Sequence, residues 1–395
     1  MIKCSKFKFT IASSYVGYVT QAIVNNFRPL LFLTFGRLYG VTVSQITLLV
    51  SLNFAVQLLT DLFSVKFIQK IGYRKAVVIA HFCSAAGLVL LAFLPDIIGY
   101  AGLITCVCIY AVGGGLIEVL ISPIVEACPT ENKTANMSLL HSAYCWGSAL
   151  VVLASTGFFT AFSIDNWRVL SMIWAVIPFL NAFSFMIVPI RTLEEGTHSL
   201  SLKSIAGSGV FWVLMLLMLC SGASEIAVSQ WASFFAEKGL GVSKTIGDLT
   251  GPCMFAVLMG SARVFCAVVG EKVPMEKYLI FSGMLCVVGY AMIALCSNPA
   301  VSLVGCCVCG IAVAAMWPGT FTLATKYLPA GGTAMFAFLA LAGDTGCSTG
   351  PGVVGVVTDV TGNMHTGFSV AMIFPVMLIL GIYILKKTNK TGDKI

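Results

Sequence analysis

Four ionisable residues, Arg28, Glu118, Glu225 and Asp344, each lie inside a run of apolar residues long enough to cross a lipid bilayer. An ionised group at that depth costs about 2.5 to 3.5 kcal/mol on insertion scales, so such residues usually serve function or pair with one another. A carboxyl group there can load and release protons near neutral pH, because low dielectric raises its pKa. These residues therefore point to solute and proton chemistry inside a membrane.

The composition indicates the elements that must position these residues. Of 395 residues, 58% are hydrophobic and 10% are charged, whereas soluble domains carry about 25% charged residues. The mean hydropathy is +0.96. We expect an all-α membrane protein with twelve transmembrane helices, because windows of about 20 apolar residues occur near 9–35, 42–67, 75–94, 99–125, 137–162, 167–190, 209–235, 249–269, 278–296, 300–323, 333–357 and 367–385.

Basic residues indicate how these helices are oriented. If both chain ends lie on one side, that side collects about seventeen Lys and Arg, and the opposite loops hold about four. Basic residues are retained in the cytoplasm, so we expect both termini there and a multi-pass protein of the cytoplasmic (plasma) membrane. The first apolar run has no cleavage site after a short apolar core, and we expect it to remain as a helix. Topology and phospholipid contact explain the net charge of +7, which gives no reason to expect nucleic acid.

Other chemistries lack the residues that they require. Nearly all of the fifteen cysteines lie inside apolar runs, where Cys acts as a small hydrophobe, and no pair has a zinc spacing with a nearby His. The sequence has no nucleotide-binding Gly-Lys-Ser loop, no nucleophile elbow and no His-Glu-x-x-His motif. We therefore expect no enzyme, no metal and no cofactor, and the pattern of charges does not favour a channel.

The two halves of the sequence resemble each other. The longest polar connection follows the sixth span, so we assign 1–190 to one six-helix bundle, 191–208 to a cytoplasmic linker and 209–395 to a second bundle. The first spans of the halves align without gaps, Thr20–Phe27 with Ser224–Trp231, polar on polar and aromatic on aromatic. Such pseudo-symmetric bundles bind substrate between the halves near the bilayer midplane, and rocking alternates access to it.

Short motifs occur in a fixed order along nearly the whole chain. They are Gly72-Tyr73-Arg74-Lys75, Gly115-Leu116-Ile117-Glu118 with Ser122-Pro123, Asn136 with His141, Gly222-Ala223-Ser224-Glu225 with Trp231, Trp317-Pro318, and Gly343-Asp344-Thr345-Gly346 followed by Gly350-Pro351. Together they resemble the major facilitator superfamily, and more specifically its fucose:proton symporter branch. The resemblance implies the superfamily fold and a sugar-like substrate.

Three positions depart from the pattern of that branch. Asn26 stands where the fucose permeases carry an acid in the first span, Gln69 where the superfamily loop motif has Asp, and Ser122 where an Asn usually precedes the proline. Proton coupling and the identity of the sugar therefore do not follow from the resemblance alone.

Helical spacing indicates which polar residues share a face. Ser14, Tyr18, Gln21, Asn25 and Arg28 recur every three or four residues and form one stripe of the first span. Lipid cannot satisfy that stripe, so it must face protein or water. It either lines a cavity or makes hydrogen bonds between helices. A similar stripe in the second span consists of Asn53, Gln57 and Asp61.

Neutral polyols are held by paired donors and acceptors from Asn, Gln, Glu and His, with an aromatic ring against the apolar side of the sugar. A lone His or Trp in an apolar helix can equally be a packing residue. With that alternative open, the predicted substrate-binding residues are Gln21, Asn25, Asn26, Arg28, Asn53, Gln57, Ser122, His141, Tyr144, Gln230, Trp231, Trp317 and Asp344.

Glu118 and Glu225 are the predicted proton-coupling residues. The alternative for Glu118 is a permanently protonated or hydrogen-bonded side chain that holds helices together. Counting depth at about 1.5 Å per residue places Arg28 nearer to Glu225 than to Glu118, so Arg28 either bridges the two halves or has a purely structural role. Gating roles near the cytoplasmic ends are predicted for Asp61, Arg74 and Arg263, the last as part of an inner scaffold not far from Glu271.

These observations favour a secondary transporter that moves a monosaccharide or related polyol with a proton by alternating access, and that works as a monomer. The main alternative is an organic anion or drug transporter of the same fold, with Arg28 as the anion anchor. A nutrient-sensing receptor on this fold is a weaker alternative, because the sequence shows no appended signalling domain.

Overall fold

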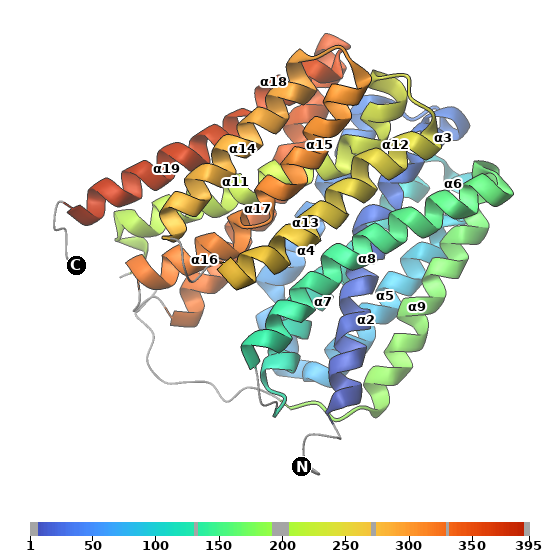
Figure 1. Cartoon of the computed structure of the whole chain (residues 1–395). Helices are drawn as coiled ribbons and strands as arrows, with labels where there is room; N and C mark the ends of the chain where they lie inside the picture. The colour runs from blue at the N-terminus through green and yellow to red at the C-terminus, as the bar shows by residue number, and fades with distance from the viewer. Residues whose placement is uncertain (1–6, 130–132, 192–204, 270–273, 329–331, 391–395) are drawn as a thin grey trace. The chain divides into compact units, whose positions relative to one another are not determined.

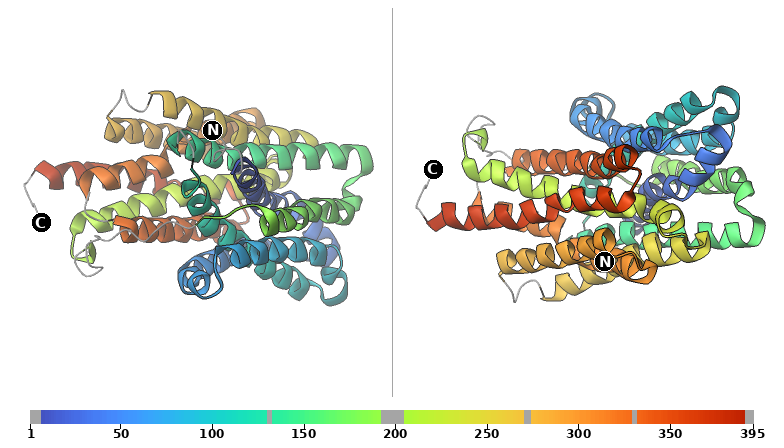
Figure 2. Two further views of the ribbon diagram at one scale, coloured as in Figure 1. Left: turned by 90° about the horizontal axis from the view of Figure 1, so that it is seen from below. Right: turned by 90° about the horizontal axis from the view of Figure 1, so that it is seen from above.

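The computed structural model describes residues 7–129, 133–191, 205–269, 274–328 and 332–390. These residues form helices joined by short connections (Figure 1). The chain divides into two compact units, Met1–Glu195 and Gly196–Ile395. Within each unit the long helices run alongside one another, as the views from below and above also show (Figure 2).

The first unit is a bundle in which α5 packs against α7 and α9, while α2 packs against α7, α8 and α9. A short 3-10 turn, η1, interrupts the first span between α2 and α3. The elements are α2 (Lys8–Asn26), η1 (Arg28–Leu31), α3 (Phe32–Tyr39), α4 (Val43–Ile71), α5 (Tyr73–Leu91), α6 (Leu94–Ile98), α7 (Tyr100–Glu126), α8 (Lys133–Phe162), η2 (Ile164–Asn166) and α9 (Trp167–Ile187).

The second unit is a bundle in which α11 packs against α17 and α19, and α14 packs against α15 and α19. Its two η segments are π-helical turns. The elements are α11 (Gly209–Phe234), η3 (Phe235–Gly239), α12 (Lys244–Asp248), η4 (Leu249–Cys253), α13 (Met254–Val269), α14 (Met275–Leu295), α15 (Pro299–Val313), α16 (Met316–Tyr327), α17 (Gly332–Thr361), α18 (Met364–Ala371) and α19 (Ile373–Lys390).

Ten stretches of helix in the described part of the chain are long and apolar enough to cross a membrane. They coincide with ten of the twelve predicted spans. The other two predicted spans are covered by α2, of 19 residues, and α17, of 30 residues. Both helices are rich in small and polar residues, which lowers their hydropathy, and both carry candidate site residues.

Small residues let α11 and α17 approach closely. A Cβ atom added at Gly346 of α17 would lie 2.0 Å from the carbonyl oxygen of Leu219 of α11, and one at Gly222 would lie 2.3 Å from the carbonyl oxygen of Gly343. No side chain fits at such distances. Close backbone contact through small residues is how helices associate when lipid removes the hydrophobic drive between them.

Candidate functional site

Four buried amide side chains form a hydrogen-bonded chain between α2 and α4, which we call the amide chain: Gln21, Asn25, Asn53 and Gln57. Asn25 Oδ1 accepts from Gln57 Nε2 at 3.0 Å and from Asn53 Nδ2 at 3.3 Å. Gln57 Oε1 in turn accepts from Gln21 Nε2 at 3.1 Å. All four side chains belong to residues at most 4% exposed.

The amide chain ends on a carboxyl group of α7. Gln21 Nε2 donates to Glu118 Oε2 at 3.1 Å, and Glu118 is half-buried. A Cβ atom at Gly114, one turn before Glu118, would lie 3.0 Å from Gln21 Oε1, so the glycine leaves room for that amide. The amide chain therefore joins α2 and α4 to α7 and ends on a carboxyl group, and a carboxylate oxygen of Asp61 lies within 4.8 Å of one of Glu118.

The two polar stripes predicted from helical spacing face the protein. Ser14, Tyr18, Gln21, Asn25 and Arg28 are all at most 6% exposed. Four of them make hydrogen bonds between helices, including Tyr18 Oη with Ser122 Oγ at 2.9 Å, whereas Ser14 Oγ donates to the Thr10 carbonyl of its own helix. That these stripes also line a solute cavity stays a prediction.

Asn26 faces a different neighbour from Asn25. Its Nδ2 donates to the Ala22 carbonyl at 2.9 Å and to Ser148 Oγ of α8 at 3.0 Å. Tyr144 of α8 is half-buried against the apolar core of the first unit. The side chains of Asn136 and His141 lie outside the described residues, so the predicted role of His141 stays a prediction.

Arg28 is 1% exposed and lies in η1, where the first span is interrupted. Its Nη1 donates to Tyr110 Oη of α7 at 3.1 Å and to the Leu49 carbonyl of α4 at 3.4 Å. These contacts join η1 to α4 and α7. The predicted bridge to Glu225 would join the two units and stays a prediction.

In the second unit, Glu225 of α11 forms an ion pair with Arg263 of α13, with Nη2 3.3 Å from Oε2. Glu225 is 8% exposed. Arg263 was expected in an inner scaffold not far from Glu271, and Glu271 lies outside the described residues. The pair with Glu225 was not expected from the sequence.

The remaining candidates of the second unit lie on α11, α16 and α17. Trp231 is fully buried, and its Nε1 donates to the Pro351 carbonyl at 2.9 Å, which is a packing contact between α11 and α17. The half-exposed ring of Trp317 packs against Gly343. Gln230 and Asp344 are 1% and 7% exposed. Their predicted contacts with a solute stay predictions.

Of the predicted gating residues, Arg74 has the clearest contacts. It donates to the carbonyl oxygens of Phe185 and Met186 at 2.9 and 2.7 Å, in the last turn of α9. A cation there satisfies carbonyl groups that have no partner within the helix and complements the helix dipole. Asp61 lies half-buried on α4, with its side chain close to Gly115 of α7.

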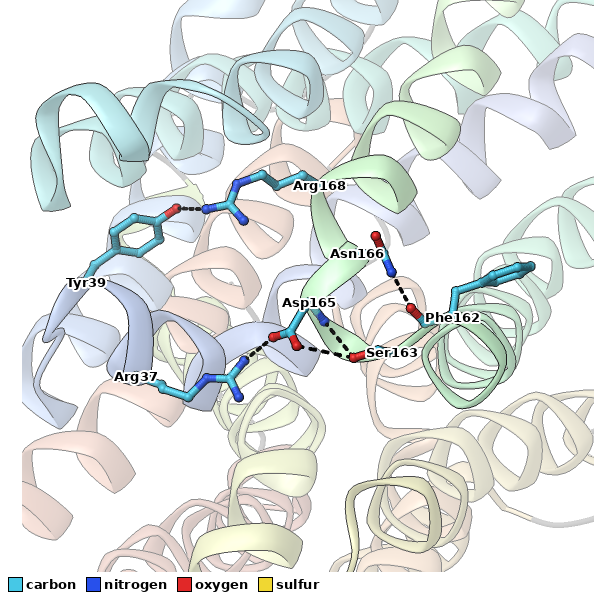
Figure 3. A network of polar contacts seen from close by, with 7 residues as sticks. All are labelled: Arg37, Tyr39, Phe162, Ser163, Asp165, Asn166 and Arg168. Atoms are coloured by element: carbon cyan, nitrogen blue, oxygen red, sulfur yellow. Dashed lines mark hydrogen bonds and ion pairs between the residues drawn. The ribbon is translucent and has the colours of Figure 1, made fainter.

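A polar network joins the connections between helices at the end of the first unit opposite to Arg74 (Figure 3). Arg37 in the last turn of α3 pairs with Asp165 of η2 at 2.6 Å. Arg168 donates to Tyr39 Oη at 3.1 Å and pairs with Asp96 of α6 at 2.6 Å. The hydrogen bond from Arg168 is the main reason that the pKa of Asp96 lies below its ordinary value.

The sequence analysis also missed a buried cluster of His81 on α5 and Asn181 on α9. These residues are 0% and 5% exposed and contact each other and α2. The sequence feature that could have indicated this cluster is the presence of one His and one Asn inside two apolar spans.

Comparisons with known proteins agree with this architecture. A family model described as Major Facilitator Superfamily matches residues 14–351. Among solved structures, a D-xylose-proton symporter superposes with a TM-score of 0.77 at 16% identity, covering 96% of this chain and 97% of that one. A bacterial homolog of the human lysosomal transporter Spinster gives 0.74 at 12% identity, covering 97% of each chain.

A single-residue variant of the E. coli fucose:proton symporter gives a TM-score of 0.66 at 16% identity and covers 96% of this chain and 99% of that one. No curated protein matches the chain. Identities this low establish the shared fold and nothing finer. The family match covers most of the sequence, and the chain belongs to the Major Facilitator Superfamily of transporters.

Proposed function

We propose that this protein is a secondary active transporter that moves a monosaccharide or related polyol across the cytoplasmic membrane by alternating access, coupled to a proton. Both termini are cytoplasmic in this proposal, residues 1–190 and 209–395 are the moving halves, and the protein works as a monomer. The observation that carries the proposal is the amide chain that ends on Glu118.

The amide chain suits a neutral polyhydroxy solute. Each Asn or Gln side chain offers two donor hydrogens and one acceptor oxygen, and each sugar hydroxyl donates one bond and accepts others. Without solute the amides bond to one another through their donor hydrogens, while the acceptor oxygens Gln21 Oε1 and Asn53 Oδ1 are buried without a partner among the described residues and can each accept from a sugar hydroxyl. A polyol can replace these mutual hydrogen bonds one by one. The free-energy difference between the empty and the solute-bound site is therefore small.

Glu118 suits the coupling proton. As a carboxylate it only accepts, and it accepts from Gln21; as a carboxylic acid it also offers a donor hydrogen. Protonation therefore changes which hydrogen bonds the end of the amide chain can make. Because coupling between two ligands is reciprocal, a proton that favours solute binding is itself bound more tightly when solute is present.

Glu225 has a different electrostatic setting, since Arg263 compensates its charge. Protonation of Glu225 would release Arg263 from the ion pair. This places a second proton-sensitive contact in the second unit, and we assign it a role in changing conformation rather than in holding the solute.

An organic anion or drug carrier remains the competing proposal, with Arg28 as the anchor. Arg28 would have to leave Tyr110 and Leu49 to reach an anion, and it is 1% exposed. The neutral amides offer an anion no charge compensation. The amides are buried to the same extent as Arg28, so the second point is the one that favours the neutral solute.

Counterflow in proteoliposomes separates the two proposals. Labelled neutral monosaccharides and polyols are tested as substrates, and unlabelled sugars and carboxylates as competitors, with and without an inward proton gradient. We expect a neutral sugar to exchange and acid outside to accelerate its uptake. Competition by carboxylates alone would establish the anion carrier instead.

A further inference from the structure

A second buried polar cluster holds α2 from the side of α5 and α9, and these three helices lie together in the first unit (Figure 1). Asn181 Nδ2 lies 2.9 Å from His81 Nε2 and also donates to the Ser13 carbonyl of α2 at 3.0 Å. Next to it, Ser13 Oγ and Ser184 Oγ are 2.6 Å apart. We call His81 and Asn181 the clasp.

The geometry fixes the protonation state that the clasp requires. His81 Nδ1 lies 2.8 Å from the Val77 carbonyl, which can only accept, so Nδ1 carries a hydrogen. The Asn181 amide uses one hydrogen on the Ser13 carbonyl and offers the other to His81 Nε2. Nε2 must then accept, and the imidazole is neutral with its hydrogen on Nδ1.

The clasp and the amide chain act on the same face of α2. Ser13, Gly17 and Gln21 are spaced by four residues, and Ser13 lies about 12 Å along the helix from Gln21 at 1.5 Å per residue. Between them, a Cβ atom at Gly17 would be 2.8 Å from Ile121 Cδ1 of α7 and 3.6 Å from His81 Nε2. At Gly17, α7 and the clasp therefore both contact this face of α2.

We propose that His81 and Asn181 are positioning residues that fix the height and rotation of α2, so that Gln21 meets both Gln57 and Glu118. A shift of α2 by one residue rotates the helix by about 100° and carries Gln21 away from both partners. The consequence for solute binding rests on the function proposed above. The ordering of α2 does not, and it is measured separately.

The test compares Asn181→Leu and His81→Phe, which remove the clasp, with His81→Gln, which keeps a neutral acceptor. Ser171→Ala is the matched control: Ser171 Oγ donates to the Leu88 carbonyl at 2.7 Å, so it also removes a buried bond between α9 and α5, but without α2. Hydrogen exchange of the α2 peptide in nanodiscs is measured without solute. Counterflow gives KM and Vmax.

We expect Asn181→Leu and His81→Phe to raise exchange in α2 and to raise KM about five-fold, the effect of one lost hydrogen bond, with Vmax within about two-fold. His81→Gln and Ser171→Ala should keep wild-type α2 exchange and KM. Wild-type α2 exchange in both clasp variants would overturn the proposal. So would raised exchange with an unchanged KM for a solute that the protein does carry. If no sugar is carried, the exchange data alone still decide whether the clasp orders α2.

Discussion

Glu118 and Glu225, the two predicted proton-coupling residues, lie in contrasting environments. Glu118 of the first unit receives a hydrogen bond from a neutral amide, Gln21, at the end of a chain of amides, and a carboxylate oxygen of Asp61 lies within 4.8 Å of it. Glu225 of the second unit pairs with a cation, Arg263. A carboxyl group beside neutral donors can change protonation without stranding a charge, whereas protonation of a paired carboxyl leaves the guanidinium behind. In the function proposed above, this contrast is the reason for giving Glu118 the solute-linked proton and Glu225 a part in conformational change.

The largest expected effect comes from Glu118→Gln. The variant keeps a group that accepts from Gln21 but cannot release a proton, so proton-driven accumulation should vanish while counterflow of solute persists. Asp165→Asn, which removes an exposed carboxylate at the end of the bundle, should leave both intact. Accumulation at the wild-type level in Glu118→Gln would remove this glutamate from coupling.

The second effect tests the charge pair. Arg263→Met leaves Glu225 uncompensated and should destabilise the protein by about 2 kcal/mol, less than a fully buried pair because both side chains keep some exposure. Adding Glu225→Gln should recover most of that loss, because no charge is then stranded. Thermal unfolding in detergent measures both. An Arg263→Met loss that the double variant does not recover would show that the pair is not the cause.

The third effect tests the amide chain. Gln57→Leu removes the bonds to Gln21 and Asn25 together and should raise the KM for solute about ten-fold, the equivalent of about 1.4 kcal/mol, with a smaller change in Vmax. Asn26→Ala removes a neighbouring amide that contacts α8 instead. If the two variants raise KM equally, the amide chain has no special part in solute binding.

The smallest effect lies at the polar network around Asp96. The pKa of Asp96 is lowered mainly by its hydrogen bond from Arg168, so the carboxylate contributes stability above its ordinary pKa. That contribution is lost as the pH falls below about 4. Asp96→Asn should cost under about 1 kcal/mol at neutral pH, since the pair is partly exposed. Unfolding measured against pH checks whether the difference from wild type shrinks in acid.

Sequence patterns predicted the fold because apolar length and helical spacing are local properties. The stripe that includes Gln21 and Asn25 and the stripe that includes Gln57 were predicted separately, and the structure joins them. Spacing alone predicts which polar residues share a helix face. It does not predict which residues they bond to, because that depends on which helices are neighbours.

The ion pair of Glu225 and Arg263 could not be found in this way. Counted from the ends of α11 and α13 at 1.5 Å per residue, the two residues differ in depth by about 15 Å. The two side chains nevertheless meet at 3.3 Å, because their contact depends on how α11 and α13 pack, which spacing along the sequence does not give. The contact between His81 and Asn181 could not be predicted from sequence either, because the two residues are 100 positions apart along the chain.

The most direct test of the central claim is a structure with solute bound. The account predicts sugar hydroxyls within hydrogen-bond distance of Gln21 and Gln57, with the 3.1 Å bond between those two side chains broken. A solute bound elsewhere, with the bonds from Gln21 to Gln57 and to Glu118 both intact, would contradict it.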